Sequence, residues 1–484
     1  MRKKVNKLIK TPKLFFKDAI KNKAKVFTKF KIRKYYSDNK YFVITAVYNM
    51  EKYLNQYFNS MFMQHLCFKK SIFLVLIDDG STDNSANIIK KYQKKYPNNI
   101  IYFYKQNGGQ ASARNFGLDY IKENFFEVDW ISFVDADDFL DVDFFYQIDK
   151  FISNNKNHNL SMLSCNVIEY NECQKKYFNV NCLSYISEWE KNEVFQTSDI
   201  PSNFYLSFCS ASLLKYEKIN NIRFDEQCKP HFEDGKFIAE FIFSLQKSDT
   251  VAFLSNAIYY YRKRKEKNST VDSLLQNTNS FINVPRIGWL DVLKKASFRY
   301  DGTVPMWIQN TIFWDIYWRV EAMLSRQHEI AALSLKQKEE TLLLMKECLK
   351  YIDTDFILSR RFLGFYWKIG ILYLLKNEKI PYRIVFFHRY DELFKEFIIS
   401  YYTYDLNEEC KVLFDDINGA YEEICKTHKI FNQDFIYEKI LRIKIPNTGK
   451  KFEIFLDNKR ANIEWDGIYY RQFFYTQRFL NKEE

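Results

Sequence analysis

The most informative segment of the chain is Trp130-Ile131-Ser132-Phe133-Val134-Asp135-Ala136-Asp137-Asp138. Its first five residues are apolar or small, as in a strand buried within a parallel sheet. Three carboxylates then follow within four positions, where like charges repel one another. Mg²⁺ or Mn²⁺ relieves such repulsion by binding one or two carboxylates together with substrate phosphates. The pattern predicts a metal held by Asp135 and Asp137; the alternative is a solvated loop in which Asp138 or Asp141 caps a helix.

The segments before this strand repeat its pattern of an apolar strand, a polar motif and an amphipathic helix. Alternating strands and helices predict a parallel sheet with right-handed crossovers, whose post-strand loops meet at one ligand-binding edge. The polar motifs therefore converge by topology alone. The predicted strands are 41–47, 71–77, 100–104 and 130–134, the predicted helices are 51–65, 84–95 and 111–123, and the motifs are Tyr48-Asn49, Asp78-Asp79, Asn107-Gly108-Gly109 and Asp135-Ala136-Asp137.

The chemistry of the side chains predicts separate roles within these motifs. Asp79 lies two strands from Asp135, so it suits hydrogen bonds from a nucleotide base or a ribose hydroxyl better than the same metal. Gly108 and Gly109 allow a ligand close to the backbone, with an ordinary turn as the alternative. Arg114, one turn into its helix, is predicted to face a phosphate or the carboxylates; a surface ion pair is the alternative.

Beyond residue 143 the pattern loosens, with strands predicted at 161–170 and 251–258. Asp234, in His231-Phe232-Glu233-Asp234-Gly235, stands just before an apolar helix at 237–245. It is either a simple N-cap or a carboxylate directed at a cleft, where it can act as a base. The aromatic and basic segment 259–264 is predicted either to close over a diphosphate or to form a solvated turn.

Taken together, the motifs resemble the family-two glycosyltransferases of the GT-A fold over roughly residues 41–260. This resemblance implies a nucleotide-sugar donor, Mg²⁺ or Mn²⁺, and inversion at the anomeric carbon. It rests on the order and spacing of Tyr48-Asn49, Asp78-Asp79-Gly80-Ser81-Thr82-Asp83, Asn107-Gly108-Gly109, Ala113-Arg114-Asn115 and Asp135-Ala136-Asp137-Asp138.

The resemblance also implies roles for individual residues. Asp137 would be the main metal ligand, with Asp135 beside the ribose and the metal. Glu233-Asp234 would supply the catalytic base, at Asp234. Ala46 departs from the family, which often has Pro there, although this position contributes mainly backbone and shape. The implied donor-binding residues are Ala46, Tyr48, Asn49, Asp79 at the base, Asn107, Gly108, Gly109, Arg114 at the nucleotide, Asp135 and Ala136.

The net charge of +12 is concentrated at the N-terminus, because residues 1–40 hold 15 Lys or Arg and two Asp. Apolar residues recur among these lysines at three- and four-residue steps, which predicts a cationic amphipathic helix on an anionic membrane surface. Nucleic-acid binding and a helix packed on the body are the alternatives. The remaining residues carry a net charge of only −1 and no nucleic-acid motif, which argues against nucleic acid.

Nine cysteines occur without a CxxC pair, which indicates reduced thiols rather than a disulfide framework or a zinc site. No apolar run is long enough to span a membrane, and no signal-peptide core is present. These features predict a cytoplasmic protein that lies peripherally on the inner face of the membrane.

The predicted fold class is α/β, with an arm (1–40), a Rossmann-like, mostly parallel GT-A domain (41–272), a helical region (273–445) and a C-terminal β-hairpin or tail (446–484). Residues 273–484 carry no catalytic constellation, so acceptor binding, homo-oligomerisation and membrane docking all stay open there.

The predicted activity is inverting, metal-dependent hexosyl transfer, with a UDP-sugar as the expected donor. The acceptor would be a hydroxyl of a bacterial surface glycan or lipid-linked glycan of the capsule, lipopolysaccharide or teichoic-acid type. The alternative is a non-catalytic scaffold that binds a nucleotide sugar at the membrane, on the same fold.

Overall fold

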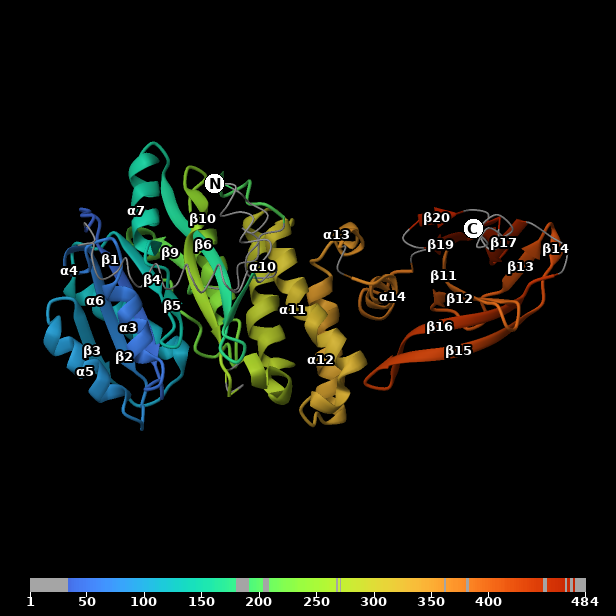
Figure 1. Ribbon diagram of the computed structural model, residues 1–484, viewed down its shortest axis with the longest axis horizontal. Helices are drawn as coiled ribbons and strands as arrows, with labels where there is room; N and C mark the ends of the chain where they lie inside the picture. The colour runs from blue at the N-terminus through green and yellow to red at the C-terminus, as the bar shows by residue number, and fades with distance from the viewer. Residues whose placement is uncertain are drawn as a thin grey trace, which may run out of the picture. The chain divides into compact units, whose positions relative to one another are not determined.

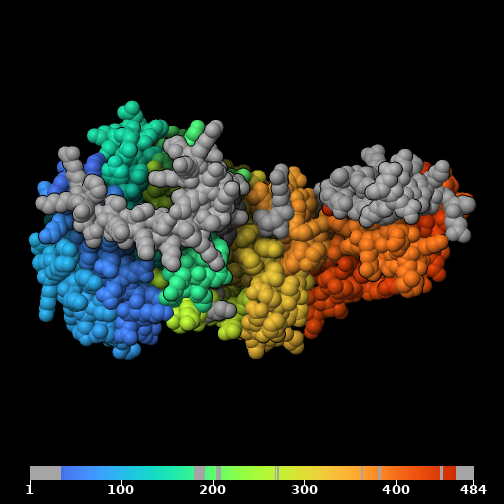
Figure 2. Space-filling view, viewed as in Figure 1, coloured from blue at the N-terminus to red at the C-terminus, as the bar shows by residue number. Residues whose placement is uncertain are grey.

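The chain forms two compact units in the computed structural model. Unit 1 holds the described residues up to Gln196, together with Ser210–Asn220 and Lys247–Lys263, and unit 2 holds the others. The catalytic domain expected at 41–272 is therefore interrupted, because residues 221–246 fold with unit 2. The structure describes residues 34–179, 191–202, 209–266, 269, 271–360, 363–379, 383–446, 451–465, 468–470 and 473–474; the other residues are grey in Figures 1 and 2.

Unit 1 is built on one mixed sheet in the order β3-β2-β1-β4-β9-β6-β10-β5, with β7 added to β6 and β8 to β10 (Figure 1). The predicted parallel part, β3-β2-β1-β4, is confirmed. Beyond it β9 is antiparallel to both β4 and β6. The strands are β1 Tyr41–Val47, β2 Ile72–Asp78, β3 Ile100–Tyr104, β4 Trp130–Phe133, β5 Phe139–Leu140, β6 Leu160–Asn171, β7 Lys176–Asn179, β8 Glu193–Gln196, β9 Ser212–Lys215 and β10 Thr250–Lys263.

Helices cover both faces of this sheet. Neighbouring residues of a strand point to opposite faces, and on β1 a Cβ on Gly117 of α6 would meet Ile44 while Thr45 hydrogen-bonds Tyr57 of α3 at 2.7 Å. Helices α3 and α6 therefore lie on opposite faces. The helices of unit 1 are α3 Leu54–Phe62, α4 Phe68–Ser71, α5 Ser85–Lys95, α6 Gln110–Asn124, α7 Phe144–Asn154 and α8 Tyr216–Ile219.

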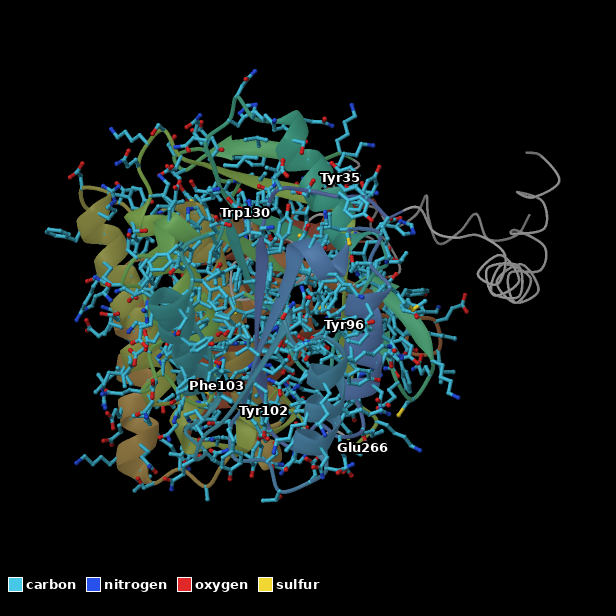
Figure 3. The ribbon with its side chains drawn as sticks, turned by 90° about the vertical axis from the view of Figure 1, so that its left-hand side faces the viewer. Tyr35, Tyr96, Tyr102, Phe103, Trp130 and Glu266 are labelled. Atoms are coloured by element: carbon cyan, nitrogen blue, oxygen red, sulfur yellow. The ribbon has the colours of Figure 1, made fainter. Side chains whose placement is uncertain are left out.

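The carboxyl ends of the parallel strands lie at one edge of the sheet. Val47 pairs with Asp78 and Asp78 pairs with Tyr104, so β1, β2 and β3 end almost level. Figure 3 shows this direction: Trp130, at the start of β4, lies above Tyr102 and Phe103, which are near the end of β3. The convergence predicted from topology is therefore present.

The last residues of the predicted N-terminal arm belong to unit 1. Tyr35 N–H donates to the carbonyl of His65 at 2.9 Å, and Lys34 Nζ donates to the carbonyl of Gln64 at 2.5 Å. Ser37 hydrogen-bonds the buried Asp149. Residues 34–40 are thus packed against the domain and not part of a separate arm, whereas the helix predicted for residues 1–33 lies outside the described residues.

Unit 2 contains helices in the first part of the region 273–445, which the sequence predicted to be helical. α12 starts with a capping box in which Ser334 and Gln337 bond each other's backbone N–H. None of the helices described is both long and apolar enough to cross a bilayer. The elements are α9 Glu233–Ser244, η2 Val271–Gln276, η3 Thr278–Ser280, η4 Val284–Trp289, α10 Leu290–Arg299, α11 Met306–Ser325, η5 Gln327–Glu329, α12 Leu335–Leu349, α13 Thr354–Ser359, α14 Phe365–Gly370 and η6 Ile371–Leu375.

Strands begin at Ile384, so the helical region predicted to reach residue 445 is wrong beyond Leu375. Residues of two sheets share one apolar core, as in a β-sandwich. A signal was present in the sequence, because β12, EFIISYYT, is rich in the β-branched and aromatic residues that favour strands. The strands are β11 Ile384–Asp391, β12 Glu396–Thr403, β13 Cys410–Phe414, β14 Ile417–Asn418, β15 Tyr421–Ile430, β16 Gln433–Lys444, β17 Lys451–Leu456, β18 Lys459–Arg460, β19 Asn462–Trp465, β20 Ile468–Tyr470 and β21 Phe473–Phe474.

The predicted terminal hairpin is correct for its first strand, β17, and for its turn. Asp457 and Asn458 both have positive φ and join β17 to β18. The chain then passes the fully buried Ala461, and β19 pairs with β11 and β20 in the other sheet. Burial of Ala461 between the sheets moves the second half of the predicted hairpin away from β17.

Candidate active site

The loop after β4 is held on one side by helix α6 and by Ser210, both in unit 1. Asp135 Oδ1 accepts from Arg114 Nη2 at 2.9 Å and from Gln110 Nε2 at 2.8 Å. Its Oδ2 accepts from Ser210 Oγ at 2.9 Å. Arg114 faces this carboxylate, as one of the two predictions for it stated. Its side chain is fully buried, so the alternative of a surface ion pair is wrong. The charge of Asp135 is therefore balanced within the protein.

Strand β10 supports the same loop from its other side. The Tyr259 hydroxyl donates to Asp138 Oδ2 at 2.6 Å and accepts from the backbone N–H of Asp135 at 3.3 Å. Arg262 donates through Nε to the carbonyl of Asp137 at 2.6 Å and through its backbone N–H to Asp138 Oδ1 at 2.7 Å. Two residues of β10 thus fix the backbone that presents Asp137.

Arg262 is buried, with its guanidinium over the rings of Tyr53, Phe139 and Tyr170. Neither interpretation of segment 259–264, as a flap over a diphosphate or as a solvated turn, fits this position. Residues 259–263 are the end of strand β10, and the guanidinium of Arg262 bonds the carbonyl of Asp137 and the side chain of Gln56.

Asp138 has a different role from its two neighbours. Its side chain is fully buried, and burial, followed by the charges of Asp137 and Asp135, raises its pKa well above the usual value for an aspartate. It is neither a solvated residue nor a helix cap, because it bonds Tyr259 and Arg262 of β10. Asp138 is therefore a structural residue behind the other two carboxylates.

The loop after β2 and the loop after β3 are anchored to each other. Asp79 Oδ1 accepts from Lys105 Nζ at 2.7 Å and Gly108 N–H at 3.0 Å, and Asp79 Oδ2 accepts from Gly109 N–H at 2.7 Å. Asn107 Nδ2 donates to the carbonyl of Asp79 at 2.9 Å. The predicted base-binding carboxylate and the predicted glycine motif therefore lie together. Oδ1 already accepts from two donors, whereas Oδ2 keeps a lone pair for one more donor.

Backbone conformation explains why two positions at this edge, Gly80 and Gly109, are occupied by glycine. Gly109 has φ +94° and begins α6, and Gly80 has φ +84° with the Asn107 backbone nitrogen 3.0 Å from the place of a Cβ. Both values lie in the region that favours glycine.

The Tyr48-Asn49 motif is joined to the loop after β2. Asn49 Oδ1 accepts from Thr82 N–H at 2.8 Å, and Asn49 N–H donates to Ser81 Oγ at 3.0 Å. Tyr48 is exposed and Ala46 is half-buried at the end of β1. The motifs after β1, β2, β3 and β4 thus surround one edge, as expected.

The carboxylates of this edge fit a magnesium- or manganese-type ion. Within the ranges that the structure describes, no group of three or more His, Cys, Asp or Glu side chains could hold a metal by itself. Asp135 and Asp137, two positions apart on an anchored loop, offer the one or two carboxylates that such an ion takes when substrate phosphates complete its shell. They would hold the ion in unit 1.

Glu233 and Asp234 belong to unit 2, where they are the first two residues of α9. The N-cap is Phe232, so the interpretation of Asp234 as an N-cap is wrong. Both acidic side chains are half-buried in the first helical turn, where the helix dipole interacts favourably with negative charge.

Several residues of the candidate site were not predicted from the sequence. Gln110 follows the glycine motif directly, and its position offered a signal. Tyr259 and Arg262 lie in segment 259–264, which the sequence did indicate, but their partners were not predicted. Ser210 and Lys105 bond residues that are distant in sequence, and only the fold brings them together.

Known proteins support the interpretation of unit 1. Residues 42–215 match the model of "Glycosyl transferase family 2". The minor teichoic acid biosynthesis protein GgaB of Bacillus subtilis is 30% identical over 336 residues, which are 69% of this chain and 35% of GgaB. GgaA of the same organism is 26% identical over 342 residues, 69% of this chain and 71% of GgaA. The chain thus spans about a third of GgaB.

Solved structures agree on the fold. The crystal structure of Staphylococcus aureus TarS aligns with 90% of this chain and 77% of its own, with a TM-score of 0.51 and 14% identity. The TarS 1–349 complex with UDP-GlcNAc aligns with 69% of this chain and 87% of its own, with a TM-score of 0.50 and 18% identity. The fold of this chain is therefore of the GT-A type found in TarS.

Proposed function

Because residues 42–215 are a glycosyl transferase family 2 domain, we propose that this chain transfers a sugar from a UDP-sugar to a hydroxyl of a teichoic-acid-type glycan, with inversion at the anomeric carbon. The observation that carries the proposal is the anchored Asp135-Ala136-Asp137 loop at the edge where four strand-end motifs meet. The names of GgaB and GgaA support the acceptor class, and the UDP-GlcNAc complex of TarS supports the nucleotide.

The motif residues bind and orient the donor. Asp79 would accept a hydrogen bond from the base, while Asn107, Gly108 and Gly109 border the same loop. Asp137 would hold a Mg²⁺ or Mn²⁺ ion, which supplies positive charge to the donor diphosphate. Arg114 and Ser210 keep Asp135 in place.

Asp234 would act as the base on the acceptor side. The acceptor hydroxyl oxygen forms a bond to the anomeric carbon on the face opposite the diphosphate. The bond from that carbon to the phosphate oxygen breaks, the electron pair leaves with UDP, and the hydroxyl proton passes to the Asp234 carboxylate. Glu233 would contribute negative charge beside it.

A panel of nucleotide sugars tests the proposal. The full chain is incubated with UDP-GlcNAc, UDP-GalNAc, UDP-glucose, UDP-galactose and GDP-mannose in Mn²⁺, with and without poly(ribitol phosphate) or poly(glycerol phosphate). We expect at least one UDP-sugar to release UDP, faster when a polymer is present, with sugar appearing on that polymer. Tight binding of a UDP-sugar without release on any polymer would support the non-catalytic scaffold instead.

The N-terminal segment is proposed to bind an anionic membrane surface. Residues 1–33 hold 13 Lys or Arg and one Asp, and each basic residue near such a surface contributes about 1 kcal/mol. Deletion of 1–33, which spares the packed residues 34–40, is expected to release the chain from vesicles of anionic lipid and to leave UDP-sugar binding unchanged.

Co-sedimentation with vesicles measures this release. A matched variant that changes Arg2, Lys3, Lys4, Lys7 and Lys10 to Gln keeps every apolar residue and should bind less tightly in proportion to the lost charge. Undiminished sedimentation of the truncated chain contradicts the proposal. Salt-sensitive binding of residues 1–33 to nucleic acid, without vesicle binding, supports the rival partner.

A further inference from the structure

The Glu233–Asp234 pair is flanked by buried and half-buried side chains that tie it to the helices of unit 2. We infer that His231, Phe232 and Lys236 form a clamp that positions this pair, and that Arg319 is the residue on which the clamp depends. The inference rests on the proposed function, because it treats Asp234 as the base. All of these residues belong to unit 2.

Arg319 on α11 holds the His231 side of the clamp. Its Nη2 donates to His231 Nε2 at 2.6 Å. Its Nε donates to the carbonyl of Ser280 at 3.0 Å and its Nη1 to that of Asp315 at 2.8 Å. The guanidinium lies over the ring of Trp289, 4.6 Å from its centroid. Because the planar guanidinium is bonded through all three of its nitrogens, its position is fixed, and His231 accepts from a rigid donor.

This contact requires a neutral His231, since Nε2 must offer a lone pair to the guanidinium. Burial, followed by the charge of Arg319, lowers the pKa of His231. Asp315, whose Oδ2 lies 3.5 Å from His231 Nε2, acts to raise this pKa. Within the described residues these are the charged groups that act on His231, and both lie on α11. Protonation would place two cations in contact and release the segment before Glu233.

Phe232 occupies a backbone conformation that a phenylalanine rarely adopts, with φ +75°. Its buried ring is held between two glycines. A Cβ on Gly288 would lie 2.8 Å from Phe232 Cδ1, and a Cβ on Gly235 would lie 3.0 Å from Cε2. Packing of the ring therefore holds the turn that starts α9 at Glu233.

Lys236 anchors the pair from the other side. Its Nζ lies 2.7 Å from Asp225 Oδ2 and 2.8 Å from Asp291 Oδ2, and it donates to the carbonyl of Ile287 at 3.0 Å. The side chain is buried, and although burial alone would lower its pKa, the bonds to the two carboxylates raise it. A charged Lys236 thus joins α9 to α10 and to the loop that carries Asp225.

Between these anchors Glu233 and Asp234 are held at both ends. A misplacement of about 1 Å in a catalytic group costs roughly 10²-fold in rate. Loss of the clamp is therefore expected to lower kcat while the donor KM, which depends on unit 1, stays unchanged.

Two substitutions of the same histidine test the clamp in the full chain, with saturating UDP-sugar and polymer. His231→Phe removes the acceptor for Arg319 and is expected to lower kcat roughly 10²-fold with an unchanged donor KM. His231→Gln keeps an oxygen acceptor and should recover most of the turnover. Because Gln does not titrate, the fall of kcat at acid pH should also move to lower pH in His231→Gln than in the natural chain.

A lysine pair provides a matched control. Lys236→Met is expected to lower kcat as His231→Phe does. Lys295→Met removes an exposed cation that also pairs with Asp291, and it should leave kcat unchanged.

Equal turnover of His231→Phe and the natural chain overturns the clamp, as does a rise in donor KM that accounts for the whole loss. If His231→Phe does not fold, the clamp is overturned when kcat of His231→Gln falls at the same acid pH as kcat of the natural chain. Asp234→Asn is measured beside these variants. An active Asp234→Asn overturns the base assignment and the clamp together, whereas an inactive Asp234→Asn beside a fully active His231→Phe overturns the clamp alone.

Discussion

Asp137→Asn is expected to abolish sugar transfer and to remove the Mn²⁺ dependence of donor binding. The substitution keeps the size of the side chain and removes the charge that a divalent cation needs. Arg262 binds the carbonyl of Asp137, so the backbone of the loop should keep its place. A cation that neutralises a developing diphosphate contributes several kcal/mol, which corresponds to a loss of about 10³-fold in kcat.

Calorimetry of UDP-sugar binding measures this effect in Mn²⁺ and in chelator. The natural chain should bind more tightly in Mn²⁺, and Asp137→Asn should bind equally weakly in both. Asp141→Asn is the matched control, because it makes the same change four residues along, at a carboxylate that accepts from the Tyr260 hydroxyl. Equal affinity of the natural chain with and without chelator would remove the metal from the mechanism.

Asp234→Asn is expected to lower transfer by roughly 10² or more, the usual scale for loss of a positioned base. Donor and metal binding should remain, because the residues proposed for them lie in unit 1. The substitution should cost little stability. Asp234 is the second residue of α9 and does not cap it, and its interaction with the helix dipole is worth about 0.3–1 kcal/mol.

A matched control separates the base from this helix effect. Asp355 is an exposed aspartate at the second position of α13, so Asp355→Asn makes the same change to another helix of unit 2. Both variants should lose a similar, small amount in melting temperature, and only Asp234→Asn should lose turnover. Normal turnover of Asp234→Asn, measured with saturating donor, would refute its assignment as the base.

Local patterns in the sequence were sufficient to predict the strands in the first half of unit 1. β1 and β3 have the predicted bounds, and β2 and β4 begin or end one residue from them. β1, β2 and β4 are apolar runs buried on both faces, β3 is a partly buried apolar run at the edge of the sheet, and each is followed by the polar residues of its loop. Parallel topology then brings those loops to one edge, so no long-range contact had to be known in advance.

The supports of the site depended on the tertiary structure. Arg262 belongs to a basic, aromatic segment that is typical of a surface, yet it is buried because the carbonyl of Asp137 and the oxygen of Gln56 face it across the fold. Whether a cation is solvated or buried depends on the acceptors that surround it, and those acceptors are far away in sequence. The same holds for Ser210 beside Asp135 and for Arg319 beside His231.

The amino-acid sequence by itself determined the parallel sheet, the edge where its motifs meet and the order of sheet, helices and strands. Only the tertiary structure decided that residues 221–246 leave the sheet domain for unit 2, that strands begin at Ile384, and that β19 joins β11. Periodicity within a segment reports which side chains seek burial. It does not report which other segment will cover them, because that choice depends on the packing of the whole chain.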